Sequence, residues 1–338
     1  MKKAKIGLVL GKFMPLQIGH EFLLQFARQF CEQLVVVVDC LEGQTMAPEV
    51  RKKCIEEAVP GVIVVALTKP MPQYPEETPD FWNIWRTTLF NAVEQAVGGK
   101  PEVIVASESY GWKLAEELGC RYIPCDLGRE SVPISATRIR KDPMAHWDYL
   151  SPSSREHFMK KVCFIGPEST GKSMCAIDVA RYFHTVYVPE YAKAIISAQN
   201  GQFYQHNVEE VATCQAASEK ALARMTTRLM VCDTDVLTTL IWSEFLYGEH
   251  PAELDELVRS SHYDITFLFE PDVIWVDDDH RHVVPYASTV EVRQNFLKLC
   301  KHWLEHFNRP YVTVKGTYQT RFQTCVKHCK SLIAPQEA

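Results

Sequence analysis

One octapeptide constrains the fold of this chain more than any other segment. GPESTGKS, Gly166–Ser173, fits the pattern GxxxxGK[ST] at every position. It follows an apolar run, KVCFIG, and precedes a predicted helix, MCAIDVARYF, which is the strand–loop–helix context that a phosphate-binding loop requires. Its glycines let backbone N–H groups surround a phosphate, and the start of the helix adds a favourable dipole. The segment therefore predicts a P-loop on a parallel α/β sheet.

The residues of the P-loop have predictable roles. Lys172 is expected to reach the β- and γ-phosphates of ATP, and the hydroxyl of Ser173 is expected to bind Mg²⁺. The ATP-binding residues predicted in this loop are Gly166, Glu168, Ser169, Thr170, Gly171, Lys172 and Ser173.

Acidic and basic residues at later strand ends complete the predicted kinase site. Asp233 ends the run LMVCD and is the expected second magnesium ligand, with Asp235 as the alternative. Glu190 ends VYVPEY, where it would either orient or deprotonate an acceptor hydroxyl or cap the following helix. Arg281 in WVDDDHRH would stabilise the transferring phosphoryl group, unless this stretch is a solvated loop. Its consecutive acidic residues point in alternate directions, which argues against a metal site there.

A second phosphate loop is predicted near the start of the chain. GKFMPLQIGH, Gly11–His20, follows the apolar run Ile6–Leu10 and precedes the helical pattern EFLLQFARQF. Lys12 and His20 could contact phosphate there. PISATRIR supplies a hydroxyl-rich turn and Arg140, and Arg129 precedes it. Together these groups describe a site that binds a triphosphate and stabilises charge developing at its α-phosphate.

Short β-branched runs alternate with helical patterns in both halves, which is typical of parallel sheets covered by helices, with ligands at the carboxyl ends of the strands. Strands are expected at Ile6–Leu10, Val35–Asp39, Val62–Leu67, Glu102–Ser107, Lys161–Gly166, Leu229–Asp233, Ile265–Phe269, Val273–Val276 and Tyr311–Val314. DPMAHWDYLSPSSREHFMKK, between the halves, mixes prolines, serines and aromatics and predicts a packed connector. The expected fold is α/β, with two parallel-sheet domains at residues 1–155 and 156–338.

Composition narrows the class of protein. The net charge of −6 does not favour nucleic acid as a partner. No run of about 18 apolar residues predicts a membrane span, and the short apolar segment after MKKAK does not fit a signal peptide. The twelve cysteines form no CxxC pair, and CVKHC, Cys325–Cys329, lacks the second pair that a zinc site needs. Free thiols in the cytoplasm are expected. The sequence leaves open whether the protein is a homo-oligomer.

The motifs carry a family resemblance. GKFxPxxxGH with ISATRIR resembles the nucleotidylyltransferase superfamily, whose signatures are (H/T)xGH and ISxxxR. With GPESTGKS, VPEYAKAI, CDTDVLTT and WVDDDHR in this order, the chain resembles the bifunctional NadR family over nearly its whole length. This resemblance implies a Rossmann-like nucleotidylyltransferase domain at 1–155 and a P-loop ribosylnicotinamide kinase domain at 156–338.

The resemblance also implies the reactions. The kinase half would convert nicotinamide riboside and ATP to nicotinamide mononucleotide (NMN), and the other half would join NMN to the AMP part of a second ATP, giving NAD and pyrophosphate. ATP is the implied co-substrate and Mg²⁺ the implied cofactor. Because the predicted sheet begins near residue 4, the helix-turn-helix domain of some family members is not expected here.

The residue patterns and the resemblance together assign the site residues. Catalytic roles are expected for Lys12, His20, Arg140, Lys172, Glu190 and Arg281. ATP binding in the first half is expected of Gly11, Phe13, Gln17, Gly19, Ser135 and Arg138. Substrate binding is expected of Trp82, Trp85, Arg129, Glu190, Tyr191 and Asp235, although core packing explains the two tryptophans equally well. Ser173 and Asp233 would hold Mg²⁺.

Three departures from the family pattern bear on function. Gln17 replaces the first His or Thr of (H/T)xGH, Lys193 stands where an Arg is usual, and HVVPYAS after Arg281 differs from the usual sequence. The first departure leaves an alternative open, in which only the kinase is active and the first domain binds nucleotide without catalysis. A P-loop regulator that binds NAD or ATP is a third hypothesis, but the sequence offers no interaction surface for it.

Overall fold

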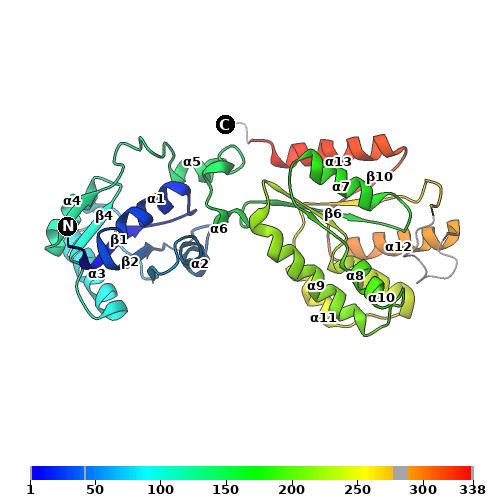
Figure 1. Ribbon diagram of the computed structural model, residues 1–338, viewed down its shortest axis with the longest axis horizontal. Coiled ribbons are helices and arrows are strands. Elements are labelled where there is room, and N and C mark those ends of the chain that lie inside the picture. Colours follow the sequence, from blue (N-terminus) through cyan, green and yellow to red (C-terminus); the bar gives the residue numbers. More distant parts are fainter. Residues whose placement is uncertain (1, 42, 277–287, 336–338) are drawn as a thin grey trace. The chain divides into compact units, whose positions relative to one another are not determined.

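The chain folds into two compact units, each built on its own sheet. The computed structural model describes residues 2–41, 43–276 and 288–335. The first unit ends at Arg155 and the second runs from Glu156 to Ala334. Within the described residues each unit holds a five-stranded sheet in which every pair of strands is parallel (Figure 1). The predicted α/β class with two parallel sheets is confirmed.

The sheet of the first unit has the strand order β3-β2-β1-β4-β5. Its strands are β1 (Ala4–Gly11), β2 (Cys31–Asp39), β3 (Ile63–Leu67), β4 (Val103–Ala106) and β5 (Arg121–Pro124). Its helices are α1 (Ile18–Ala27), α2 (Pro48–Ala58), α3 (Phe81–Val97), α4 (Tyr110–Leu118), α5 (Ala136–Lys141) and α6 (Pro152–Arg155), with 3₁₀ turns at Pro75–Glu77 and Trp147–Tyr149. The order reverses at β1, so the crevice for a ligand opens at the carboxyl ends of β1 and β4.

The central strands of this sheet are buried because their side chains meet helices. Val35 and Val37 of β2 lie with Leu8 of β1 in a core that also contains Trp85 and Leu89 of α3. Successive side chains of a strand point to opposite faces, and a strand covered on both faces is apolar throughout, as VVVV in β2 is.

The sheet of the second unit has the strand order β10-β9-β6-β8-β7. Its strands are β6 (Lys160–Ile165), β7 (Tyr187–Val188), β8 (Leu229–Asp233), β9 (Ile265–Phe269) and β10 (Tyr311–Val314). Its helices are α7 (Lys172–Tyr182), α8 (Tyr191–Ala198), α9 (Asn207–Leu222), α10 (Val236–Tyr247), α11 (Glu253–Ser260), α12 (Val290–His306) and α13 (Tyr318–Ile333), with a 3₁₀ turn at Ala223–Met225.

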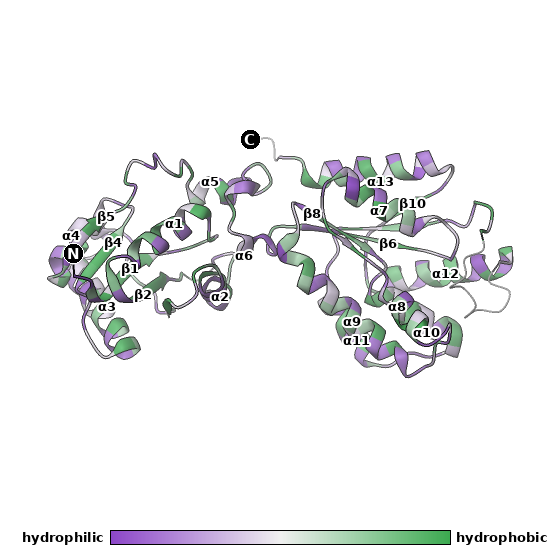
Figure 2. Ribbon diagram, in the orientation of Figure 1, coloured by the Kyte–Doolittle hydropathy of each residue, from purple (hydrophilic) through white to green (hydrophobic). Residues whose placement is uncertain are grey.

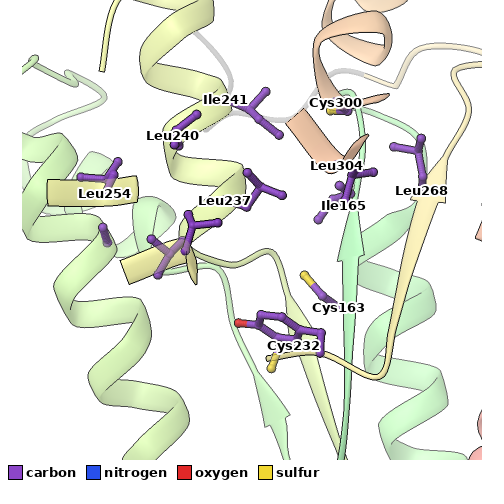
Figure 3. Packing of buried hydrophobic residues seen from close by; sticks show 14 of the residues in the cluster. Cys163, Ile165, Cys232, Leu237, Leu240, Ile241, Leu254, Leu268, Cys300 and Leu304 are labelled. Atoms are coloured by element: carbon purple, nitrogen blue, oxygen red, sulfur yellow. The ribbon is translucent and has the colours of Figure 1, made fainter. Parts of the chain in front are cut away.

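Helices cover both faces of this second sheet (Figure 1). Val162 and Phe164 of β6 pack with residues of α7 and α13, whereas Cys163 and Ile165 point to the opposite face. There the side chains of α10 and α12 meet the strands, as Leu237, Ile241 and Leu304 do in Figure 3. The strands are accordingly hydrophobic over most of their length, although β6 begins with two lysines, while the helices carry both hydrophilic and hydrophobic residues (Figure 2).

One predicted strand does not form. Val273–Val276 was expected to be a strand but leaves the sheet after β9. Ile274 is 90% exposed and Val276 is 67% exposed, and both line a cavity. These apolar side chains therefore line a cavity of the size of a ligand and do not pack in a sheet. The sequence reading also missed β5 (Arg121–Pro124), an edge strand whose sequence, RYIP, contains no apolar run.

The first part of the predicted connector packs on the first unit. Trp147 is 2% exposed, Leu150 is fully buried, and Leu150 forms an isolated bridge with Gln17. This connector therefore belongs to the first unit up to Arg155. No helix in the described part of the chain has the length and apolar content needed to cross a membrane.

Candidate active sites

The first site forms where two neighbouring strands end. The register of β1 and β2 pairs Gly11 with Val38, so Lys12 and Asp39 leave the sheet side by side. Arg51 of α2, only 1% exposed, donates hydrogen bonds to the carbonyl oxygens of Lys12 and Asp39, both at 3.3 Å. This buried guanidinium fixes both strand ends, and the Lys12 and Asp39 side chains face one cavity.

His20 lies in the first turn of α1, where it is half-buried. Nδ1 is buried and has no hydrogen-bond partner among the described residues, and the ring meets the Phe13 ring edge-on at 5.0 Å between centroids. Burial, and then the positive charge of Arg129, lower the pKa of His20 to about 4. At neutral pH the free protein therefore offers a neutral imidazole, a hydrogen-bond donor without a formal charge.

Gln17 is the residue that departs from the superfamily signature, and it lies at the start of α1. It is 5% exposed, and its Oε1 accepts a hydrogen bond from the Gly19 backbone N–H at 2.7 Å. A backbone N–H can only donate, so the oxygen of the amide is the end that caps the helix. The amide nitrogen is then left as a donor, and Gln17 lines a cavity together with Lys12 and His20.

Two arginines converge on the same cavity. Arg129 pairs with Glu108 at 2.7 Å between Nη2 and Oε1. Arg140 donates to the carbonyl oxygen of Met14 at 2.5 Å and to Oγ1 of Thr137 at 2.9 Å. Both arginines line the cavity, in positions that suit the neutralisation of a bound triphosphate.

Some residues of the predicted ISxxxR segment stabilise a helix, and some line the cavity. Ser135 caps α5, and its hydroxyl accepts from the Arg138 backbone N–H at 3.3 Å. Ser135 also lines the cavity, but Arg138 does not. The expected contact between the Arg138 side chain and ATP is therefore not supported by its position.

The first site consists of two adjoining cavities. One, of about 280 Å³, is polar and contains Gln17, Gly19, Arg129 and Arg140. The other, of about 460 Å³, is largely aromatic, with Phe81, Trp82, Trp85 and Tyr110 in its lining. The residues that line both are Lys12, Phe13, His20, Leu23, Ser107 and Glu108. If each cavity held a ligand that carries a phosphate, the two phosphates could therefore approach each other beside Lys12 and His20.

The two tryptophans pack within the first unit and also line a cavity. Trp85 is 6% exposed and donates from Nε1 to the carbonyl oxygen of Pro72 at 2.9 Å, which makes it a core residue. Trp82 is half-buried and packs against Phe81 edge-on at 5.0 Å between centroids. Both rings nevertheless line the aromatic cavity.

The second site surrounds the P-loop, whose backbone is held by two buried arginines. Arg321 of α13 donates to the carbonyl oxygen of Thr170 at 3.2 Å, and Arg293 of α12 donates to that of Ser169 at 3.3 Å. With its carbonyl oxygens satisfied from behind, the loop can present its N–H groups to a phosphate. The sequence reading missed both arginines because each lies more than 120 residues from the loop.

Gly166 begins the P-loop at a position that only glycine can occupy. Its φ is +142°, and a Cβ there would lie 2.6 Å from the carbonyl oxygen of Phe269. Gly166 therefore serves the close packing of the loop on β9, and it does not line the cavity that the other predicted loop residues enclose.

Five polar side chains meet beside the P-loop. Asp233 is fully buried, its Oδ2 accepts from the Tyr187 hydroxyl at 2.9 Å, and its Oδ1 has no hydrogen-bond partner in the described structure. Lys193 of α8 places its ammonium 2.9 Å from Oγ of Ser173, 3.2 Å from Oε2 of Glu190 and 3.7 Å from Oδ2 of Asp233. Burial, and then the charge of Glu190, raise the pKa of Asp233.

The side chain of Glu190 favours the catalytic alternative over the capping one. Glu190 stands directly before α8, but its carboxylate makes no capping hydrogen bond. It pairs with Lys193 and lines the cavity.

This cavity of the second unit measures about 810 Å³ and has two parts. One part is the P-loop with Lys172 and Ser173. The other is apolar, with Ile196, Phe203, Trp242 and Leu246 in its lining, none of which the sequence reading had singled out. The sequence alone does not show whether a Trp in a helix lines a cavity or packs in the core.

Two residues predicted to bind substrate have other partners. Asp235 is 1% exposed; its Oδ1 accepts from the backbone N–H and the hydroxyl of Thr238, and its Oδ2 pairs with Arg309. Neither Asp235 nor Tyr191 lines the cavity. Asp235 is therefore the N-cap of α10, a role that Asp commonly has, and its predicted contact with substrate does not fit this geometry.

The remaining predictions concern a loop and two cysteines. Arg281 and the acidic run before it lie outside the described residues. Cys325 and Cys329 are fully buried in α13, and the described residues include no cluster that could hold a metal ion through three His, Cys, Asp or Glu side chains.

Comparison with known proteins extends over the whole chain. Residues 161–321 match a family model described as an AAA domain. The chain is 25% identical over 355 aligned residues to the trifunctional NAD biosynthesis/regulator protein NadR of Escherichia coli, which covers 99% of this chain and 85% of that protein. A solved NadR protein in complex with NR superposes with a TM-score of 0.80 at 20% identity, covering 98% of this chain and 97% of that chain. A NadR protein in complex with NAD and AMP-PNP gives a TM-score of 0.78 at 21% identity, covering 100% and 99%.

The two parallel five-stranded sheets have the fold of the solved NadR proteins, an α/β class with two sheets in succession along the chain. Within that class the chain is similar to NadR along essentially its entire length. The resemblance predicted from the motifs is confirmed.

Proposed function

We propose that this protein is a bifunctional enzyme of NAD salvage, which phosphorylates nicotinamide riboside to NMN and then adenylylates NMN to NAD. The observation that carries the proposal is the presence, in one NadR homologue, of two separate phosphate loops, each beside a cavity with room for a second substrate. ATP is the co-substrate of both reactions.

The kinase reaction is assigned to the second unit. The P-loop would hold the β- and γ-phosphates with Lys172, and the apolar part of the cavity near Trp242 would hold the riboside. Glu190 would accept the proton of the attacking hydroxyl. The expected role of Arg281 remains a prediction.

The residues near Asp233 fit Mg²⁺. Magnesium takes oxygen ligands, usually one or two carboxylates together with substrate phosphates and water. Oδ1 of Asp233, which is buried and has no hydrogen-bond partner among the described residues, would be one such oxygen ligand, and the hydroxyl of the neighbouring Ser173 would be a second. When bound, Mg²⁺ would neutralise charge on the transferred phosphoryl group.

The adenylyl transfer is assigned to the first unit. A phosphate oxygen of NMN would attack the α-phosphorus of ATP, the bond to the β-phosphate oxygen would break, and pyrophosphate would leave. Lys12, His20, Arg140 and the amide nitrogen of Gln17 would donate hydrogen bonds to the oxygens on which charge develops. No general base is needed, because the attacking phosphate is already ionised.

The test is product analysis. Protein incubated with nicotinamide riboside, ATP and Mg²⁺ should yield NMN and then NAD, separable by chromatography. NMN without NAD would favour the second candidate, a kinase whose first domain only binds nucleotide. The observation that favours this candidate is the engagement of the Gln17 oxygen with Gly19, which leaves a neutral donor where the superfamily has His or Thr. A cytoplasmic location and the absence of nucleic-acid partners remain predictions.

A further inference from the structure

Asp39 is a buried carboxylate that the proposed mechanism does not use. It ends β2, is 4% exposed and lines the aromatic cavity. Its Oδ1 is buried and has no hydrogen-bond partner among the described residues. A buried acceptor without a donor costs free energy comparable to a lost hydrogen bond, so such a group in a cavity points to a ligand that supplies the donor.

Nearby positive charges do not satisfy this carboxylate. The guanidinium of Arg51 is turned to backbone carbonyl oxygens, including that of Asp39 itself, and not to the carboxylate. Burial raises the pKa of Asp39, while the side chain of Gln73 and the charge of Lys12 oppose this shift only in part. The carboxylate is thus an electrostatically unfavourable group in the unliganded cavity, and a cationic ligand would relieve it.

The walls around Asp39 define which ligand fits. The cavity is also lined by Phe81, Trp82, Trp85 and Tyr110, and the charge of Asp39 is near enough to Tyr110 to help raise the pKa of its phenol. Aromatic faces bind flat rings and attract cations, and a carboxylate among them adds a counter-charge. The structure therefore provides an aromatic slot with one negative group, which suits a planar, positively charged heterocycle that carries hydrogen-bond donors.

We propose that Asp39 determines the specificity of this cavity by distinguishing the carboxamide of nicotinamide mononucleotide from the carboxylate of nicotinate mononucleotide. This inference rests on the proposed adenylyltransferase function of the first unit. Both mononucleotides contain the pyridinium ring, but only the amide adds N–H donors for Oδ1. The acid would instead bring a second carboxylate into a poorly solvated space, and like charges there are strongly unfavourable.

Binding without ATP tests this proposal independently of catalysis. Calorimetric titration of the wild-type protein should show tighter binding of nicotinamide mononucleotide than of nicotinate mononucleotide. Asp39→Asn keeps the shape and removes the charge. Its preference should fall by about tenfold or more, which corresponds to roughly 1.4 kcal/mol, mainly because the nicotinate compound binds better. Glu49→Gln, which removes an exposed carboxylate of α2 outside the cavity lining, should leave the preference unchanged.

Several results would separate the possibilities. An unchanged ratio of the two dissociation constants in Asp39→Asn, with a normal melting temperature, overturns the proposal. An equal loss of affinity for both mononucleotides also overturns it, because Asp39 would then act on the shared ribose or phosphate. If the wild-type protein forms no dinucleotide from either compound and ATP, yet the preference in binding shifts as expected, the adenylyltransferase function fails and the role of Asp39 stands.

Discussion

At the scale of single residues, Gln17 is predicted to limit how strongly the first unit stabilises the transition state of adenylyl transfer. Gln17→His should raise the rate of NAD formation from NMN, by about tenfold, because imidazole restores the group that the superfamily signature carries at this position. His20→Ala should nearly abolish it, since loss of a transition-state donor typically costs 10²–10³ in rate. Steady-state kinetics with NMN and ATP measure both effects.

The capping role of Gln17 supplies the control. Gln17→Ala removes both the bond to Gly19 and the donor, so it should lower both the melting temperature and the rate. If Gln17→His leaves the rate unchanged and the wild-type protein makes NMN but no NAD, the first unit is not a working adenylyltransferase.

His20 has a predicted effect on stability at low pH. Its pKa is about 4 in the folded protein and near the ordinary value of 6.5 in the unfolded chain. Between these values the unfolded chain binds more protons, so the free energy of unfolding should fall as the pH drops from 6.5 to 4. In urea unfolding at several pH values, the free energy of unfolding of His20→Asn should depend less on pH over this range than that of the wild-type protein. An identical pH dependence in both proteins would contradict a buried neutral imidazole.

Lys193 is predicted to compete with the metal ion. Its ammonium contacts Ser173, Glu190 and Asp233, the oxygens expected around Mg²⁺. Lys193→Met should therefore tighten the binding of Mn²⁺ to the nucleotide-free protein by about tenfold, because the carboxylates lose their internal counter-ion. Electron paramagnetic resonance of free Mn²⁺ measures this, and Lys193→Arg, which keeps the charge, is the matched control. Equal or weaker Mn²⁺ binding in Lys193→Met would exclude competition.

At the scale of elements, the P-loop depends on a helix far away in sequence. Arg321 of α13 is 1% exposed and donates to the carbonyl oxygens of Thr170, Gly316 and Glu270. Arg321→Met should lower the melting temperature and weaken ATP binding, because each buried carbonyl left without a donor costs about 1–3 kcal/mol. Calorimetry and ATP titration measure the two effects. Arg181→Met, whose side chain is 77% exposed on α7, is the control expected to change neither.

Sequence patterns predicted the elements whose side chains fill the cores. The strands Leu229–Asp233, Ile265–Phe269 and Tyr311–Val314 form with the predicted limits, because burial on both faces of a sheet leaves an apolar run. Val273–Val276 has the same local pattern, but Val273, Ile274 and Val276 line a cavity. The local sequence does not show whether an apolar side chain packs against a neighbouring strand or faces a ligand.

The predicted site residues show the same limit. Loop motifs identify site residues that lie close together in the sequence. Lys12, His20 and Lys172 belong to such motifs, and each of them lines a cavity as expected. Arg293 and Arg321 are fixed by tertiary contacts and leave no local signal. Asp39 could have been found, since it ends an apolar strand just as Asp233 does.

At the scale of the whole molecule, the two reactions should be separable by mutation. Lys172 lies in the second unit, and the phosphate loop of the first unit lies before Arg155. Lys172→Ala should abolish the formation of NMN from nicotinamide riboside, because the β- and γ-phosphates lose their cation, while conversion of added NMN to NAD continues at a near-normal rate. His20→Ala should show the reverse pattern, with NMN accumulating. Each variant is assayed with each substrate separately, after its melting temperature is compared with that of the wild-type protein. A folded Lys172→Ala protein that loses both activities equally would mean that one ATP site serves both reactions.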